Sequence, residues 1–464
     1  MSTPRCHHCD EFGRASFLRR SVAQAGNGLP AIEPGMPRPA GTGLDRRAFL
    51  SRTAGTALTV YGATSLLPAA FDEGIARAAA LGGGGNRVLV NVFLPGGADA
   101  LSVLAPVGDG RYRKLRPGLA FKPGDGPAFR EDARLHWHPA LKPLAELHKR
   151  GRLSVFPAIG YTDPDQSHFT SRHYWEVGQL DVQASTGWLG RLVDVIGDGE
   201  NAMQGLSLDG ALLPSLATAK NPVSSLASPA DYRFDSQNVW DVVDELLGDA
   251  IGDLGALAKH PDPTLAQASQ TAAQSDRLRR QLSRFVGKDG QASFDSKAKY
   301  PDGEFAKRLA GLAAMLDRGF PIRVAALTGP GDYDTHADQA GALEQGLGAV
   351  AQSLAAFQQD IERRGLGGRV LTLVWTEFGR RAEQNADNGT DHGAAGSAFL
   401  LGTRARGRMV GEFPGLQRLD RDGNLRHTSD FRALYASLLE QWFDVDAARI
   451  LPDAKKMPRY KVVA

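Results

Sequence analysis

Runs of apolar, largely β-branched residues recur along most of the chain and predict strands. Five stand out, at residues 87–94, 153–160, 323–329, 369–375 and 397–403. Each is mainly apolar and does not alternate regularly with polar residues, which is the pattern of strands covered on both faces.

Helical patterns separate these runs, and the clearest one begins at Leu343. Apolar residues follow it at steps of four and three, namely Leu347, Val350, Leu354, Phe357 and Ile361. This spacing puts one apolar stripe on one helix, and Gly365 is the expected stop signal. Strands that alternate with long helices predict an α/β fold with a mainly parallel, doubly wound sheet. We expect a single domain at 84–464, with a helical insertion at about 224–302.

Composition narrows the classes of partner. The chain has 464 residues, 42% of them hydrophobic, so it can bury a large core. Its formal net charge is only +2, which disfavours nucleic acid as a partner. The two cysteines, Cys6 and Cys9, lie in a segment rich in Pro and Gly. They supply half of a zinc site at best. We therefore interpret residues 1–43 as a disordered extension.

Segment 44–80 has the features of an export leader. Arg46 and Arg47 are followed by a mildly apolar stretch and by small residues near Ala78 and Ala80. The stretch is shorter than the roughly 20 residues needed to cross a bilayer, so we expect a removed leader and no stable membrane anchor. The segment resembles a twin-arginine signal, which implies the translocation machinery as a partner and a periplasmic or extracellular location. The alternative is an amphipathic N-terminal helix.

Four predicted strands are followed by carboxylates or imidazoles. These residues are Asp99 after the first strand, His168 after the second, Asp334 and His336 after the third, and Glu377, Asp391 and His392 after the fourth. Ligands of open α/β sheets bind outside the carboxyl ends of the strands. Clustered carboxylates with imidazoles suit a divalent ion such as Zn or Mn. Taken alone, Asp99 is better explained as a turn former and His168 as a helix-start residue. The coincidence of four such loops is what favours a metal site.

Ser167 stands where the helix after the second strand is expected to start. It is either a plain N-cap or a nucleophile activated beside a metal, and the sequence favours neither. Arg380 follows the fourth strand and could bind an anionic group through paired donors, although loop arginines are commonly just solvated.

Four stretches carry a family resemblance: FLPGGADALS, QSHFTSRHYWE, YDTHADQ and WTEFGRRAEQNADNGTDHG. They resemble the bacterial family called domain of unknown function 1501 and, more distantly, the alkaline phosphatase and sulfatase superfamily. The resemblance implies an alkaline phosphatase-like fold with up to two adjacent metals. It assigns the residues as follows: Asp99 as first ligand, Ser167 as nucleophile, Asp334 and His336 on one metal, Glu377 on the other, and His392 as closing ligand beside Asp391. We assign His168 and Arg380 to substrate binding.

The chain departs from the superfamily pattern in two places. Glu377-Phe378 stands where an Asp-His pair is common, and fewer histidines are available for the first metal, so the number of metals stays open at one or two. The sequence predicts an exported, metal-dependent hydrolase of a small phosphate or sulfate ester, without an organic cofactor. The alternative is a non-catalytic exported binding protein that keeps the fold and at most one structural metal.

Overall fold

The computed structural model describes residues 86–199, 201–228, 241–257, 260–287 and 292–464. The extension expected at 1–43, with Cys6 and Cys9, lies outside these residues, as does the export signal expected at 44–80 with Arg46 and Arg47. Among the described residues, no helix combines the length and the apolar character needed to span a membrane.

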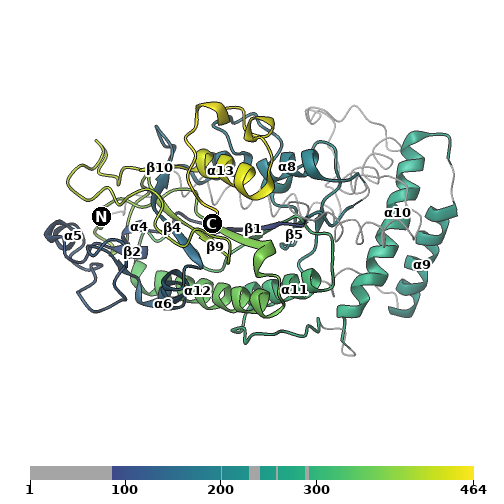
Figure 1. Cartoon of the computed structure of the whole chain (residues 1–464), viewed down its shortest axis with the longest axis horizontal. Helices are drawn as coiled ribbons and strands as arrows, with labels where there is room; N and C mark the ends of the chain where they lie inside the picture. The colour runs from purple at the N-terminus through teal and green to yellow at the C-terminus, as the bar shows by residue number, and fades with distance from the viewer. Residues whose placement is uncertain (1–85, 200, 229–240, 258–259, 288–291) are drawn as a thin grey trace, which may run out of the picture.

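A mixed sheet forms the centre of the described chain (Figure 1), with eight strands in the order β10-β4-β9-β8-β1-β7-β5-β6. The strands are β1 (Val88–Phe93), β4 (Leu153–Gly160), β5 (Gly205–Ser207), β6 (Ser224–Ser225), β7 (Val324–Thr328), β8 (Val370–Trp375), β9 (Gly396–Leu401) and β10 (Ser429–Asp430). A separate two-stranded ladder pairs β2 (Leu104–Ala105) with β3 (His136–Trp137). Seven strands of the main sheet run in one direction, and β9 pairs antiparallel with both of its neighbours.

The predicted α/β fold is confirmed, because all five apolar runs are strands of this sheet. The sequence pattern missed β5, β6 and β10, which have only two or three residues each and are too short to show a period.

Strand register places three of the ligand-bearing loops side by side. Phe93 at the end of β1 pairs with Thr328 at the end of β7 and with Trp375 at the end of β8. The three central strands therefore end level with one another. The chain segments that follow them leave the sheet at the same edge.

Helices cover both faces of the sheet (Figure 1). Helices α6 (Lys142–Lys149), α11 (Glu304–Asp317) and α12 (Gln339–Arg363) lie on one face, and α8 (Trp188–Ile196) and α13 (Phe431–Phe443) lie on the other. Further helices are α4 (Ala100–Val103), α5 (Gly110–Leu115) and α7 (His168–Val177).

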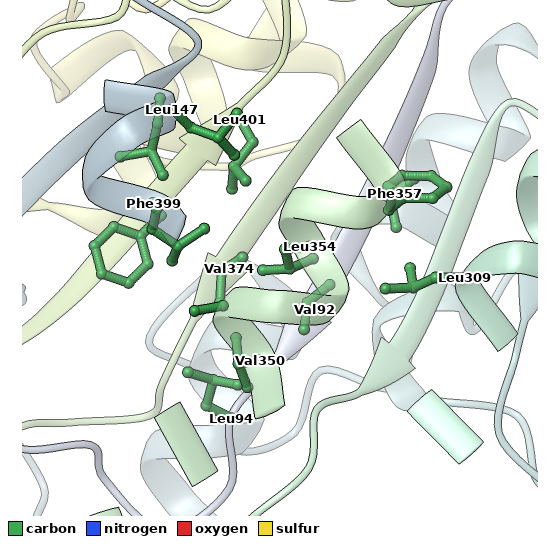
Figure 2. Close-up of a cluster of buried hydrophobic side chains, with 14 of the residues drawn as sticks. Val92, Leu94, Leu147, Leu309, Val350, Leu354, Phe357, Val374, Phe399 and Leu401 are labelled. Carbon is green, nitrogen blue, oxygen red and sulfur yellow. The ribbon is translucent and has the colours of Figure 1, made fainter. Parts of the chain in front are cut away.

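Strand β1 divides its side chains between two cores. Val88, Val90 and Val92 pack into the core shared with α12, whereas Leu89 and Phe93 pack into the core shared with α13. Figure 2 shows strand residues on the α12 side, with Val92 and Val374 facing Val350 and Leu354 of that helix. Burial on both faces explains why the strands are apolar without alternation.

The apolar stripe predicted from Leu343 to Ile361 is confirmed in helix α12. The six apolar residues from Leu343 to Ile361 are all buried, and the helix ends two residues before Gly365, whose φ is +74°. Helices α9 (Asp241–Leu257) and α10 (Pro263–Leu282) pack on each other at one end of the molecule, within the range in which the sequence predicts a helical insertion.

Candidate metal centre

The loops after β1 and β7 are pressed together where they leave the sheet. Gly96 has a φ of +108°, and a Cβ atom there would lie 2.3 Å from the backbone nitrogen of Asp334. Only glycine tolerates both this dihedral and this approach. The contact brings Asp334 over the ends of β1 and β7.

Three imidazoles and one carboxylate converge at this point. Nε2 of His392 lies 3.0 Å from Nε2 of His168 and 3.0 Å from Nε2 of His336. Oδ1 of Asp334 lies 3.0 Å from Nε2 of His392, 3.0 Å from Nε2 of His336 and 3.4 Å from Nε2 of His168. The tightest group, in which all ligand atoms lie within 4.8 Å of one another, consists of His168, Asp334 and His392.

The opposite ring nitrogen of each histidine faces an oxygen acceptor. Nδ1 of His168 lies 2.8 Å from Oε1 of Glu377, and Nδ1 of His392 lies 2.9 Å from the carbonyl oxygen of Gln166. Nδ1 of His336 lies 3.3 Å from Oδ1 of Asp391. A carbonyl or an ionised carboxylate only accepts, so each Nδ1 carries the hydrogen, and in a neutral ring Nε2 then presents a lone pair.

The group fits a divalent cation. Lone pairs and a carboxylate oxygen that face one another repel unless a positive charge lies among them. A tetrahedral zinc with bonds of about 2.0–2.1 Å separates its ligand atoms by about 3.4 Å, close to the spacings of this group. Histidine ligands whose other nitrogen is tied to a carboxylate or a carbonyl are the usual arrangement around protein-bound metals.

Burial and close contacts shift the pKa values of the residues in this cluster. Burial alone lowers the pKa of His168, but hydrogen bonds to Asp334 and Glu377 outweigh it and raise that pKa to about 9. Burial lowers the pKa of His392, and the nearby charges of Arg380 and His168 add to the effect. Burial raises the pKa of Asp334, but the three histidine rings and the Arg380 guanidinium that face it keep that pKa well below its usual range.

Glu377 lies beside the cluster and orients it. Its two oxygens accept from the backbone nitrogens of Gly96, at 2.9 Å, and Gly97, at 3.1 Å. Burial raises the pKa of Glu377, but the hydrogen bond and charge of His168 bring it below its usual value. In this structure Glu377 acts on His168, and direct ligation by Glu377 stays a prediction. Asp391, half exposed, stands in the same relation to His336.

Asp99 is at the expected edge of the sheet but outside the cluster. Its carboxylate is fully buried and forms an ion pair with Arg116, whose Nη2 lies 2.9 Å from Oδ1. It also accepts from Ser102 Oγ at 2.6 Å and from Gln339 Nε2 at 2.7 Å. Burial raises the pKa of Asp99, but the Arg116 charge brings it below its usual value. The structure does not bring Asp99 together with the three histidines.

Arg380 is a buried brace between loops. Its guanidinium donates to the carbonyl oxygens of Gly97 at 2.9 Å, Thr390 at 2.9 Å and Tyr333 at 3.0 Å, and to Oδ1 of Asp334 at 2.6 Å. These bonds hold Asp334 in place. The assignment of Arg380 to substrate binding stays a prediction.

Ser167 occupies the N-cap position of α7, but its side chain makes no capping hydrogen bond. Its backbone nitrogen donates to Oδ1 of Asp165 at 2.8 Å. Sequence reasoning singled out Ser167 and assigned the next residue, His168, to the substrate. The structure places His168 in the cation cluster. The available signal was that His168 follows a predicted strand, as the other imidazoles of the cluster do.

A cavity of about 890 Å³ opens beside the cluster. His168, Asp334 and Glu377 contribute to its wall, together with residues of α7 and of the loop after β5. Neither Ser167 nor Arg380 is part of this wall. A ligand in the cavity would therefore meet the cluster from the side of His168 and Asp334.

Fold and site together define an α/β protein with a histidine and carboxylate cluster suited to a divalent cation at the carboxyl edge of its sheet. By sequence, the chain belongs to the family described as "Protein of unknown function (DUF1501)", whose model matches residues 145–451. Every predicted residue of the catalytic, metal and substrate site except Asp99 falls within that match. No curated protein matches the chain in sequence.

Several solved structures are similar to the chain. A protein of the alkaline phosphatase superfamily from Vibrio parahaemolyticus is 10% identical, with a TM-score of 0.34 over 79% of this chain and 67% of that one. The lipoteichoic acid synthase LtaP from Listeria monocytogenes is 7% identical, with a TM-score of 0.34 over 79% and 74%. The PsFucS1 sulfatase from Pseudoalteromonas sp. is 9% identical, with a TM-score of 0.33 over 90% and 74%. Similarity this distant carries no argument about activity, which has to come from the site.

Proposed function

We propose that the chain is an exported, metal-dependent hydrolase of a phosphate or sulfate ester. One observation carries the proposal: three histidines with anchored Nδ1 atoms direct Nε2 toward one another and toward Asp334. The cluster borders a cavity large enough for a small organic ester. Export rests on the Arg46-Arg47 motif of the sequence alone.

One metal suits these residues better than two. His168, His392 and Asp334 would hold it, with His336 as a fourth ligand on the more exposed side. A bound divalent ion would supply Lewis acidity to a phosphoryl or sulfuryl oxygen. The resemblance assigns Asp99 and Glu377 to metals as well, but Asp99 is neutralised by Arg116, and Glu377 is engaged by two backbone nitrogens and His168.

The chain's own residues have separable tasks in this proposal. Glu377 fixes the ring of His168, and Arg380 fixes the carboxylate of Asp334. Ser167 remains the candidate nucleophile, at the start of α7, where the helix dipole favours an anion.

Elemental analysis of the purified, folded protein, followed by assays on panels of phosphate and sulfate esters, tests the proposal. We expect close to one equivalent of Zn or Mn and hydrolysis of at least one ester class. A protein without a transition metal, even after dialysis against each ion, would contradict it.

A second candidate is a non-catalytic exported binding protein that keeps one structural metal. The observation in its favour is that the cavity wall does not include Ser167, the one nucleophile that the sequence suggests. Full metal content combined with no turnover across both ester panels would favour this candidate.

A further inference from the structure

Arg172 lies in the wall of the cavity one helical turn beyond His168 on α7. Its Nε donates to Oε1 of Glu176 at 2.8 Å, and its guanidinium carbon lies 4.6 Å from the ring centroid of Phe93. Within the described part of the chain, its two terminal nitrogens make no hydrogen bond. Glu176 thus holds the guanidinium at Nε, and Phe93 packs against its face. Nη1 and Nη2 remain available to bind a ligand.

The free edge of a guanidinium matches two oxygens of an acidic group. Paired, parallel N–H bonds to such oxygens are stronger and more directional than bonds from a lysine ammonium. Because Glu176 and Phe93 already fix the orientation of Arg172, little side-chain freedom is lost when an anion binds.

Much of the remaining wall is apolar. It includes Phe169 on α7, Val182, and Leu212, Leu213 and Pro214 in the loop after β5. Val182 is 58% exposed and can contact an apolar group in the cavity. A sugar would need a hydrogen-bonding partner for each hydroxyl, whereas this wall suits a hydrocarbon or aromatic group.

Carboxylates in the cavity wall limit the negative charge that a bound ligand can carry. Among the described residues, five of them line the cavity against one guanidinium: Glu176, Asp209, Asp332, Asp334 and Glu377. Asp209 is satisfied by Arg308 and by the hydroxyl of Thr328, and Asp334 and Glu377 belong to the cation cluster. Glu176 and Asp332 remain against the guanidinium of Arg172, and these two carboxylates oppose a doubly charged group more strongly than a singly charged one.

We propose that the cavity binds a singly charged ester anion with an apolar body, of the class of alkyl or aryl sulfates and phosphodiesters. Arg172 binds the acidic group, and the wall from Leu212 to Pro214 holds the apolar body. The inference rests on the proposed function, because it names the substrate class of the same site. It adds Arg172 as the residue that determines specificity.

Calorimetric titration of the metal-loaded protein and of the chelator-treated protein tests the inference. The probes are methyl, butyl and octyl sulfate, with octyl phosphate at pH 8 as the doubly charged comparison. We expect octyl sulfate to bind at least about 100-fold more tightly than methyl sulfate, since a fully buried methylene contributes up to about fourfold. Octyl phosphate should bind more weakly than octyl sulfate.

Variants separate the two parts of the site. Arg172→Ala should weaken the binding of every sulfate at least tenfold, and Arg172→Lys should recover only part of the loss because an ammonium lacks the paired donors. Leu213→Asn should weaken octyl sulfate but not methyl sulfate. Arg421→Ala is the matched control, because that side chain is 93% exposed.

Each outcome decides one of the two proposals. Equal affinity for methyl and octyl sulfate, unchanged binding by Arg172→Ala, or tighter binding of octyl phosphate would overturn this inference while leaving the metal site in place. Conversely, the protein could bind octyl sulfate through Arg172 and yet take up no metal. This result would contradict the proposed metal-dependent hydrolase but support the proposed ligand class.

Discussion

Oε1 of Glu377 lies 2.8 Å from Nδ1 of His168, although 209 positions of sequence separate the two residues. The contact joins the loop after β8 to the start of α7. It fixes which nitrogen of His168 carries the hydrogen, and it thereby turns the other nitrogen toward Asp334 and His392. Loss of the Glu377 carboxylate should therefore weaken metal binding.

Glu377→Gln should lower metal affinity about 10- to 100-fold, which is the usual effect of removing a group that orients a metal ligand. The two carboxylate oxygens together accept from Gly96, Gly97 and His168. Glutamine has only one terminal oxygen, and its terminal NH₂ group cannot accept, so at least one of these hydrogen bonds is lost. Competition with a chelating indicator measures the change. The matched control is Glu362→Gln, whose carboxylate pairs with Arg152 in a partly exposed bridge. Equal losses in both variants would argue against a specific role for Glu377.

Metal affinity should increase with pH. The pKa of His168 is raised to about 9 in the absence of a metal, so a cation that binds at pH 7 must displace a proton from this ring. Between pH 7 and 9 the apparent affinity should rise by up to about tenfold per pH unit and then level off. Indicator competition across this range measures it, and calorimetry in buffers of different ionisation enthalpy counts the released proton. Affinity that is flat from pH 7 to 9 would show that His168 binds no metal.

The same pKa shift predicts a pH-dependent stability for the metal-free protein. A proton that is bound more tightly in the folded state stabilises that state, and this contribution is complete below the unfolded value of about 6.5 and lost as pH rises through about 9. The free energy of unfolding of chelator-treated protein should therefore decrease between pH 6.5 and 9. His168→Gln, which cannot titrate, should remove this part of the decrease. Chemical unfolding of both proteins at several pH values measures it.

Asp99→Asn should destabilise the fold without emptying the metal site. The substitution leaves Arg116 buried without a countercharge, which typically costs about 3–5 kcal/mol. Urea unfolding gives the loss of stability, and elemental analysis of the folded variant gives the metal content. A variant of normal stability that has lost its metal would instead restore Asp99 as a ligand, the role implied by the superfamily resemblance.

Local sequence signals account for the fold and for the position of the site. Continuous apolar runs mark β1 and β8, and a stripe at steps of three and four marks α12, because burial on two faces or on one stripe leaves a readable period. Asp334, His336 and His392 could be named because they follow strands that end at one edge. The hydrogen-bond and ion-pair partners of the site residues could not be predicted from the sequence. The pairing of Asp99 with Arg116, the bracing of Asp334 by Arg380 and the contact of Glu377 with His168 depend on how loops pack, which leaves no period in the sequence.

Export remains a prediction of the sequence. Replacing Arg46 and Arg47 with Lys should leave the protein in the cytoplasm, because the pair is recognised by a receptor and positive charge alone does not replace it. Fractionation of cells that produce either form measures the distribution. Deletion of residues 2–40 is the control and should not change the folded body. Unchanged export of the Lys variant would remove the twin-arginine assignment.

Ser167 can be tested sharply, because its side chain makes no capping hydrogen bond in the structure. Loss of a capping serine typically costs about 1 kcal/mol, so Ser167→Ala should cost clearly less than that in urea unfolding. If Ser167 is the nucleophile, the same variant should lose turnover while its metal content and fold survive, because only the attacking oxygen is gone. Thr170→Val is the matched control, since Thr170 lies on the same helix and in the cavity wall. An active wild type and a fully active Ser167→Ala variant would end the candidacy of Ser167. Loss of turnover in Thr170→Val alone would transfer that candidacy to Thr170.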